Sequence, residues 1–94
     1  MSHLVYRERV HKFGKFAGQT ETYWPDHDAR GLYEMADPAF GDQKHHKKNA
    51  IFVGSEAAAV SLMKRFGFYL RMRGYLTGQR NLISPDEIKD LPNA

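Results

Sequence analysis

The first 25 residues of the chain contain two segments of strand character separated by a turn. Along residues 3–13 apolar and charged side chains alternate, and neither face is purely apolar. This pattern predicts a strand, and its mixed faces are typical of an exposed or edge strand. Gly14 and Gly18 bracket a turn, and residues 20–24 are rich in β-branched and aromatic side chains. We therefore expect a β-hairpin that ends at Pro25.

The middle of the chain holds two segments of different character. Residues 26–43 contain Gly31, Pro38 and Gly41 and have no clean period, which predicts a loop with one helical turn at residues 32–36. Residues 49–53 are a short apolar run, which predicts a buried strand.

Residues 55–73 have the strongest pattern, and we expect them to form one long helix. Ser55 is a suitable N-cap, and Glu56 places a negative charge in the first turn, where it complements the helix dipole. Gly74 suits the left-handed position that ends many helices. Six apolar residues share one face of this helix and form its expected core side: Ala59, Leu62, Met63, Phe66, Tyr69 and Leu70.

The last part of the chain predicts a strand and a short helix. Residues 79–83 read as a strand after the turn at Thr77 and Gly78. Ser84 and Glu87 have the spacing of a capping box, and Pro85 suits the first helical position, so we expect a helix over residues 85–91. The fold class that follows is α+β: a small three- or four-stranded, mainly antiparallel sheet with one long helix on one face and a short C-terminal helix.

Length and composition narrow the class of protein. The 94 residues suffice for one domain, residues 1–94, and the hydrophobic share of 41% is that of a packed globular protein. There is no cysteine, which excludes disulfides, thiolate zinc sites and cysteine nucleophiles. No segment is long and apolar enough to span a membrane, and residues 1–12 carry charges throughout. We therefore expect a cytoplasmic protein that does not act at a membrane.

The distribution of charge tells more than the net charge of +3. Residues 26–43 are acidic, whereas residues 44–83 contain eight Lys and Arg residues against the single acidic residue Glu56. Such segregation creates a local positive field that attracts polyanions. A plain solvated basic surface is the alternative.

The long helix offers the leading candidate for an anionic partner, with nucleic acid first. Lys64, Phe68 and Arg71 would lie together on the side away from the core, where the charges meet phosphates and the ring stacks on a base. The full expected nucleic-acid surface comprises Lys64, Arg65, Phe68, Arg71, Arg73, Lys47, Lys48 and Arg80. The donors of the turn over residues 74–81 suit the same purpose.

The main alternative is a module that binds another protein or a second copy of itself. Phe68, Met72 and the edge strand would then form the contact. The Tyr23–Trp24 pair is either part of a recognition surface or part of the core.

A third hypothesis is a small enzyme or metal protein that uses residues between Asp26 and His46. Imidazole and carboxylate groups occur at residues 26–28 and at His45 and His46, but adjacent histidines rarely ligate one ion. The acidic residues show no spacing that selects a general acid and base. No nucleophile or phosphate-loop motif is present, so we favour a binding module without catalytic residues, metal or cofactor.

Overall fold

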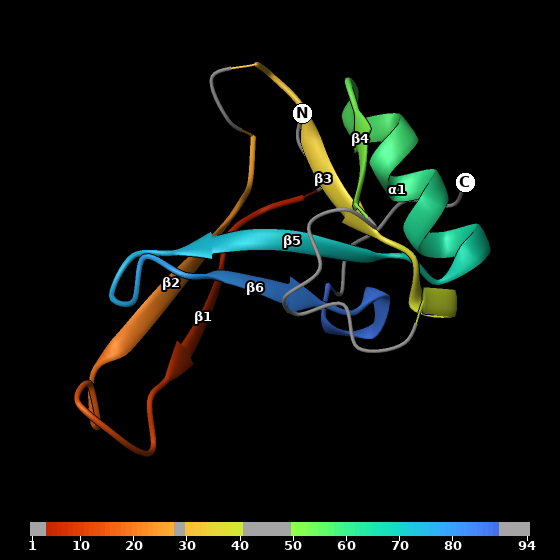
Figure 1. Ribbon diagram of the computed structural model, residues 1–94. Coiled ribbons are helices and arrows are strands. Elements are labelled where there is room, and N and C mark those ends of the chain that lie inside the picture. The colour runs from red at the N-terminus through yellow and green to blue at the C-terminus, as the bar shows by residue number, and fades with distance from the viewer. Residues whose placement is uncertain (1–3, 28–29, 41–49, 89–94) are drawn as a thin grey trace.

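The computed structural model describes residues 4–27, 30–40 and 50–88 and shows an α+β fold (Figure 1). In these residues an antiparallel sheet of six strands accompanies a single α-helix, α1 (Glu56–Phe66). The strands are β1 (Arg7–Val10), β2 (Thr20–Pro25), β3 (Tyr33–Ala36), β4 (Ala50–Val53), β5 (Tyr69–Gly74) and β6 (Arg80–Ile83). The class agrees with the sequence, but the sheet has six strands rather than three or four.

Strand β5 is the centre of the sheet. β6 pairs with one edge of β5. The other edge is shared: β2 pairs with the C-terminal half of β5, and β3 pairs with the N-terminal end of β5. β1 extends the sheet beyond β2, and β4 extends it beyond β3. The two outer pairs diverge, and the β1–β2 hairpin projects away from the rest of the molecule (Figure 1). This hairpin and the edge position of β1 confirm the prediction.

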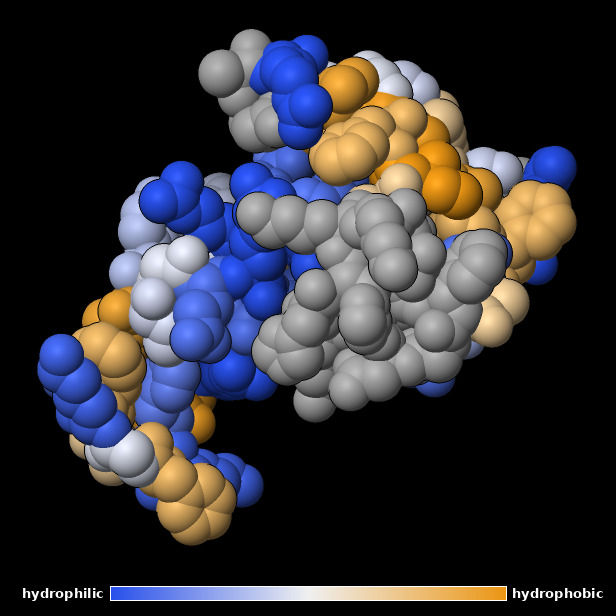
Figure 2. Space-filling view, viewed as in Figure 1, coloured by the Kyte–Doolittle hydropathy of each residue, from blue (hydrophilic) through white to orange (hydrophobic). Residues whose placement is uncertain are grey.

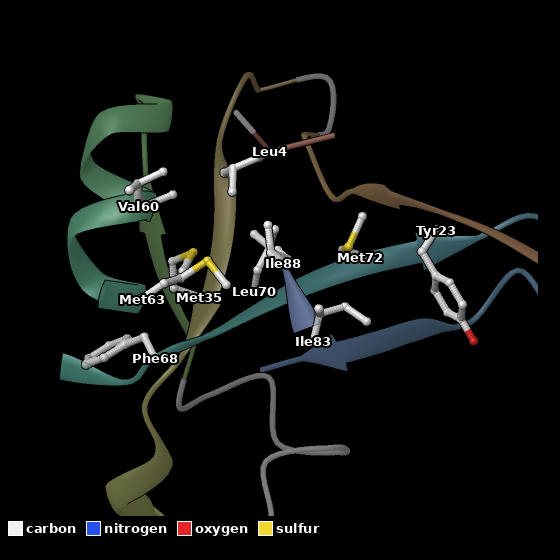
Figure 3. Close-up of a cluster of buried hydrophobic side chains, with 11 residues drawn as sticks. Leu4, Tyr23, Met35, Val60, Met63, Phe68, Leu70, Met72, Ile83 and Ile88 are labelled. Atoms are coloured by element: carbon white, nitrogen blue, oxygen red, sulfur yellow. The ribbon is translucent and has the colours of Figure 1, made fainter. Parts of the chain in front are cut away.

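The sheet has an apolar face, which α1 covers, and a polar face. Met35, Leu70 and Met72 belong to the core on the apolar face; Val60 and Met63 of the helix lie near Met35, whereas Met72 lies farther along the sheet (Figure 3). Because successive side chains of a strand point to opposite faces, the alternate positions of β2, β3, β5 and β6 belong to the polar face. The aligned registers place Trp24, Glu34, Arg71, Arg73 and Arg80 among the residues of this face.

Helix α1 begins where the sequence predicts and ends earlier. The Ser55 side chain accepts a hydrogen bond from the backbone N–H of Ala58 at 3.1 Å, which confirms the N-cap. The C-cap is Gly67, with φ of 70°, and its N–H reaches the carbonyl groups of Leu62 and Met63. The expected continuation to residue 73 is therefore wrong. A left-handed glycine ends the helix, and the next residues pair as β5.

The early end of the helix changes its core face. Ala59, Met63 and Leu70 are buried as expected, but Leu70 belongs to β5. Phe66, in the last turn of α1, is 64% exposed, whereas Phe68 beyond the cap is only 8% exposed. The aromatic ring that completes the core is therefore Phe68 (Figure 3).

Three other local predictions need correction. Residues 33–36 form strand β3 rather than a helical turn. Strand β4 lies where a strand was expected, but it is an edge strand, and Ile51 and Phe52 are each 41% exposed. The capping box is present: the Glu87 carboxylate accepts from the backbone N–H of Ser84 at 3.4 Å. It caps a 3₁₀ turn, η3 (Pro85–Glu87), and the end of the expected helix, residues 89–91, lies outside the described residues.

A second short 3₁₀ turn, η1 (Pro38–Phe40), follows β3. None of the helices in the described ranges is long and apolar enough to cross a membrane.

Candidate functional site

The structure divides the nucleic-acid surface that the sequence predicts. Lys64 and Arg65 are exposed on α1, on the side of the sheet that carries the core. Phe68 and Arg71 are buried, so they do not form an exposed helical face with Lys64. Arg73 and Arg80 lie together on the polar face, and Lys47 and Lys48 lie outside the described residues. The predicted grouping around the helix is therefore wrong.

Arg71 is buried because it pairs with a carboxylate of the neighbouring strand. Its Nε lies 2.8 Å from Glu34 Oε2, and the two side chains are 3% and 2% exposed. A buried charge needs such a partner, since its desolvation is otherwise costly. The ion pair with Glu34 therefore compensates for the burial of the Arg71 charge.

Phe68 and Met72 are buried and cannot form the self-association surface that the sequence suggests. Phe68 is 8% exposed and Met72 is fully buried in the core. The edge strand β1 remains at the border of the sheet. The contact expected between these three features is not available on the surface.

A cleft opens on the polar face, next to the turn that joins β5 to β6. Its volume is about 570 Å³. The end of β2, the end of β5 and the start of β6 supply its walls, and its lining residues are Trp24, Pro25, Asp26, His27, Arg73, Gly74, Tyr75, Gly78 and Arg80. The lining combines aromatic rings with charged groups of both signs.

Three residues form a straight line across the strands at this cleft. Trp24 of β2 lies directly opposite Arg73 of β5, and Arg73 lies directly opposite Arg80 of β6. Like charges at directly opposed positions destabilise a sheet. In the part of the chain that the structure describes, Arg73 has no ion-pair partner. The line therefore brings positive charge beside an aromatic ring.

Trp24 belongs to a row of three exposed aromatic rings, which we call the aromatic row: Tyr6, Trp24 and Tyr75. The ring of Trp24 lies 4.9 Å from that of Tyr6 and 6.2 Å from that of Tyr75, measured between centroids. Tyr6 is 47%, Trp24 40% and Tyr75 71% exposed. Large aromatic side chains with this exposure leave flat apolar surface available for stacking.

Arg80 is held by two buried carboxylates. Its Nε lies 2.9 Å from Asp26 Oδ2, and its Nη1 donates to Glu34 Oε1 at 2.8 Å. Burial raises the pKa of the Glu34 carboxyl above its ordinary value; Arg71 and Arg80 lower that pKa, and the adjacent Asp26 carboxyl raises it again, so the net shift is upward. The protonated form of Glu34 is thus favoured relative to an exposed glutamate.

A second polar cluster fixes the turn at the edge of the cleft. Glu21 is fully buried; its Oε1 contacts His11 Nε2, and its Oε2 accepts from Thr77 Oγ1 at 3.2 Å. Thr77 Oγ1 in turn accepts from the backbone N–H of Gln79 at 3.1 Å. This cluster ties the β5–β6 turn, which carries Tyr75, to the β1–β2 hairpin.

The metal hypothesis finds no support in the described residues. They contain no group of three or more His, Asp or Glu side chains that could hold an ion. Asp26 and His27 border the cleft, while Asp28, His45 and His46 lie outside the described residues.

Sequence reasoning identified some residues of the cleft and missed how they meet. Arg73 and Arg80 belong to the predicted surface, and the turn over residues 74–81 was recognised as a concentration of donors. Trp24 was an ambiguous candidate. Tyr6 lay in the expected edge strand and Tyr75 in the recognised turn, but neither ring was expected to contribute to a binding surface. The available signal was the alternation of β2, which already places Trp24 on the face opposite Tyr23.

Comparison with known proteins gives no match: no family model, no curated protein and no solved structure is significantly similar to this chain, so an assignment of the cleft must come from its own geometry.

Proposed function

We propose that the protein binds single-stranded nucleic acid at the aromatic row and the cleft beside it. The observation that carries the proposal is the alignment of exposed Trp24 with exposed Arg73 on the face opposite the core. Bases stack on aromatic side chains whatever their sequence, and arginine next to the ring meets the phosphate of the same nucleotide.

A single strand fits this surface better than a duplex does. Stacking requires unpaired bases, whose flat faces are accessible. Duplex readout instead uses an element that enters a groove, and α1 is a helix of 11 residues with one side against the sheet. The chain is basic, with a net charge of +3, which supports attraction of a polyanion.

The test uses the intrinsic fluorescence of Trp24, the only tryptophan of the chain. Single-stranded DNA and RNA of about ten nucleotides, within the site size of a small binding module, are titrated at low salt, with duplex DNA for comparison. We expect quenching by the single strands and an affinity that falls steeply with added salt. No quenching and no binding at tens of micromolar would exclude the proposal.

Variants locate the interface. Tyr75→Ala is expected to weaken binding by about 1 to 3 kcal/mol with little change in the salt dependence, because it removes a stacking platform. Arg73→Ala is expected to flatten the salt dependence by about 0.7 in log–log slope, the contribution of one phosphate contact on a single strand. Arg65→Ala is the matched control, since it removes the same charge from exposed α1. If Arg65→Ala weakens binding and Arg73→Ala does not, the helix is the interface.

A second candidate function is self-association at the opposite end of the sheet. Ile51 and Phe52 on the edge strand β4 and Phe66 on α1 are exposed large apolar residues. Figure 2 shows hydrophobic residues gathered at the end of the molecule near β4 and α1, whereas the surface to the left of the grey atoms is mostly hydrophilic. Sedimentation of the free protein tests self-association: a Phe52→Ser variant should dissociate any dimer that forms there.

A further inference from the structure

Arg80 is held by two carboxylates and is nevertheless partly exposed. Asp26 engages its Nε and Glu34 its Nη1, so two of its N–H groups are fixed from two directions. The two carboxylate side chains are 8% and 2% exposed, whereas that of Arg80 is 35% exposed. Arg80 therefore has a buried anchor and an exposed part that borders the cleft.

A guanidinium group keeps further N–H donors when two are occupied, and its planar geometry matches the oxygen atoms of a phosphate. An arginine that is already immobile loses little conformational freedom when it binds an anion. Second-layer carboxylates that orient a binding group are a general means of achieving this. Asp26 and Glu34 have that position relative to Arg80.

The charge of the cluster also permits an anion to bind. Arg71 and Arg80 balance Asp26 and Glu34 when both carboxyls are ionised, and Arg73 next to Arg80 adds a positive charge. The raised pKa of Glu34 shifts the balance further towards positive charge. These five groups therefore carry a net positive charge, although two of them are carboxylates.

The distance between Arg80 and the aromatic row determines which group of a bound nucleotide Arg80 can contact. Trp24, Arg73 and Arg80 occupy three adjacent strands, and neighbouring strands lie about 4.8 Å apart, so the backbones at Trp24 and Arg80 are about 10 Å apart. A base stacked on Trp24 would place a phosphate of its own or of the next nucleotide within reach of Arg73 and Arg80.

We propose that Arg80 is a preset phosphate-binding residue of the cleft, and that Asp26 and Glu34 are positioning residues that hold its guanidinium for the phosphodiester next to a base on Trp24. This inference rests on the proposed function and adds to it a division of roles. The aromatic row supplies stacking, Arg73 supplies a mobile charge and Arg80 supplies a fixed one.

Asp26→Asn separates positioning from simple charge. The substitution keeps the shape of the side chain and removes a negative charge beside the cleft. If charge alone governs binding, affinity for a single-stranded oligothymidylate of about ten nucleotides should rise. If Asp26 positions Arg80, affinity should fall, and we expect a loss of about threefold to tenfold with the salt dependence unchanged. A rise in affinity overturns the proposal.

Substitutions of Arg80 test the contact itself. Arg80→Ala should lower affinity about tenfold and reduce the log–log salt slope by about 0.7. Arg80→Lys should keep the slope but recover only part of the affinity, because an ammonium group cannot engage two carboxylates and a phosphate with one planar fork. Arg65→Ala serves as the control for loss of one positive charge. Equal affinity and slope for Arg80→Ala and the unmodified protein would overturn the inference.

The unmodified protein provides a measurement that does not depend on the folding of variants. The NMR signal of the Arg80 Nε–H group should shift and exchange more slowly with water when the oligothymidylate is added. Quenching of Trp24 without a change in that signal would retain the proposed function and exclude this role of Arg80. Absence of any quenching would instead exclude the proposed function.

Discussion

Gly74 lies directly against the carboxylate of Glu21. A Cβ atom at position 74 would fall 1.6 Å from Glu21 Oε2 and 2.6 Å from its carboxyl carbon. Glu21 cannot easily move away, since it is fully buried and held by His11 and Thr77. The absence of a side chain at position 74 thus allows the hairpin and the β5–β6 turn to come together.

We therefore expect Gly74→Ala to destabilise the protein by about 1 to 3 kcal/mol, the usual cost of overpacking. Urea unfolding measures the change. Gly54→Ala is the matched control, because a Cβ there would meet only Leu32 Cδ2 at 3.7 Å, an ordinary contact. If the two substitutions cost the same, the contact between Gly74 and Glu21 is unimportant for stability.

Gly67 determines where the helix ends. The sign of the change in the free energy of unfolding for Gly67→Ala tests this role. Gly67 has φ of 70°, so Gly67→Ala should cost about 1 to 2 kcal/mol, because a Cβ is unfavourable in the left-handed region. Were the helix to continue to residue 73, the same change would replace a helical glycine and stabilise the protein by about 1 kcal/mol. Thermal or urea unfolding of the variant distinguishes the two results.

Truncation should destabilise the protein strongly at Phe68 and very little at Phe66. Phe68→Ala removes a buried ring from the core and should cost about 3 to 5 kcal/mol. Phe66→Ala removes a ring that is 64% exposed and should change the free energy of unfolding by about 0.5 kcal/mol or less. The helix expected from the sequence places Phe66 in the core and Phe68 outside it, so it predicts the larger loss of stability for Phe66→Ala. Unfolding of the two variants therefore tests the path of the chain after residue 66.

The elements that the sequence predicted correctly depend on local signals. The hairpin follows from alternation and two turn glycines, the start of α1 from Ser55, and β6 from a short β-rich run after a turn. Each of these signals lies within a few residues of the element it specifies. The α+β class could be predicted because these local elements were sufficient for it.

The elements that were missed depend on distant partners. β5 is buried on both faces along most of its length, so it lacks the alternation of a strand with one wet face. Arg71 looks like a surface residue in the sequence, and only its pairing with Glu34 of β3 explains its burial. Glu34 lay in a segment without a clean period, within the helical turn that was expected over residues 32–36.

The candidate site was only partly predictable for the same reason. The sequence indicated that Arg73 and Arg80 belong to one basic surface, but it did not reveal that Trp24 pairs across from Arg73. That register brings together β2 and β5, which are far apart in the chain. The two carboxylates that hold Arg80 come from two further segments.

The pH dependence of stability provides a test of the buried carboxyl cluster. Burial raises the pKa of Glu34 in the folded state above its unfolded value, against the opposing effect of Arg71 and Arg80. Between the unfolded and the folded pKa, the folded protein therefore keeps a proton that the unfolded chain releases. The resulting contribution to stability is fully present below the unfolded pKa, and it is lost as the pH rises through the folded pKa.

Glu34→Gln removes this titration, so the unmodified protein should lose stability relative to the variant as the pH rises from about 4 to neutral. The ion pair with buried Arg71 exists only while Glu34 is ionised, and its favourable effect is already contained in the net upward shift of the Glu34 pKa. The expected slope of the difference between the two proteins therefore follows from that shift alone. Urea unfolding of both proteins across this range gives the difference directly. If the unmodified protein instead gains stability relative to Glu34→Gln as the pH rises, the two arginines dominate the carboxyl and its pKa is lowered by folding.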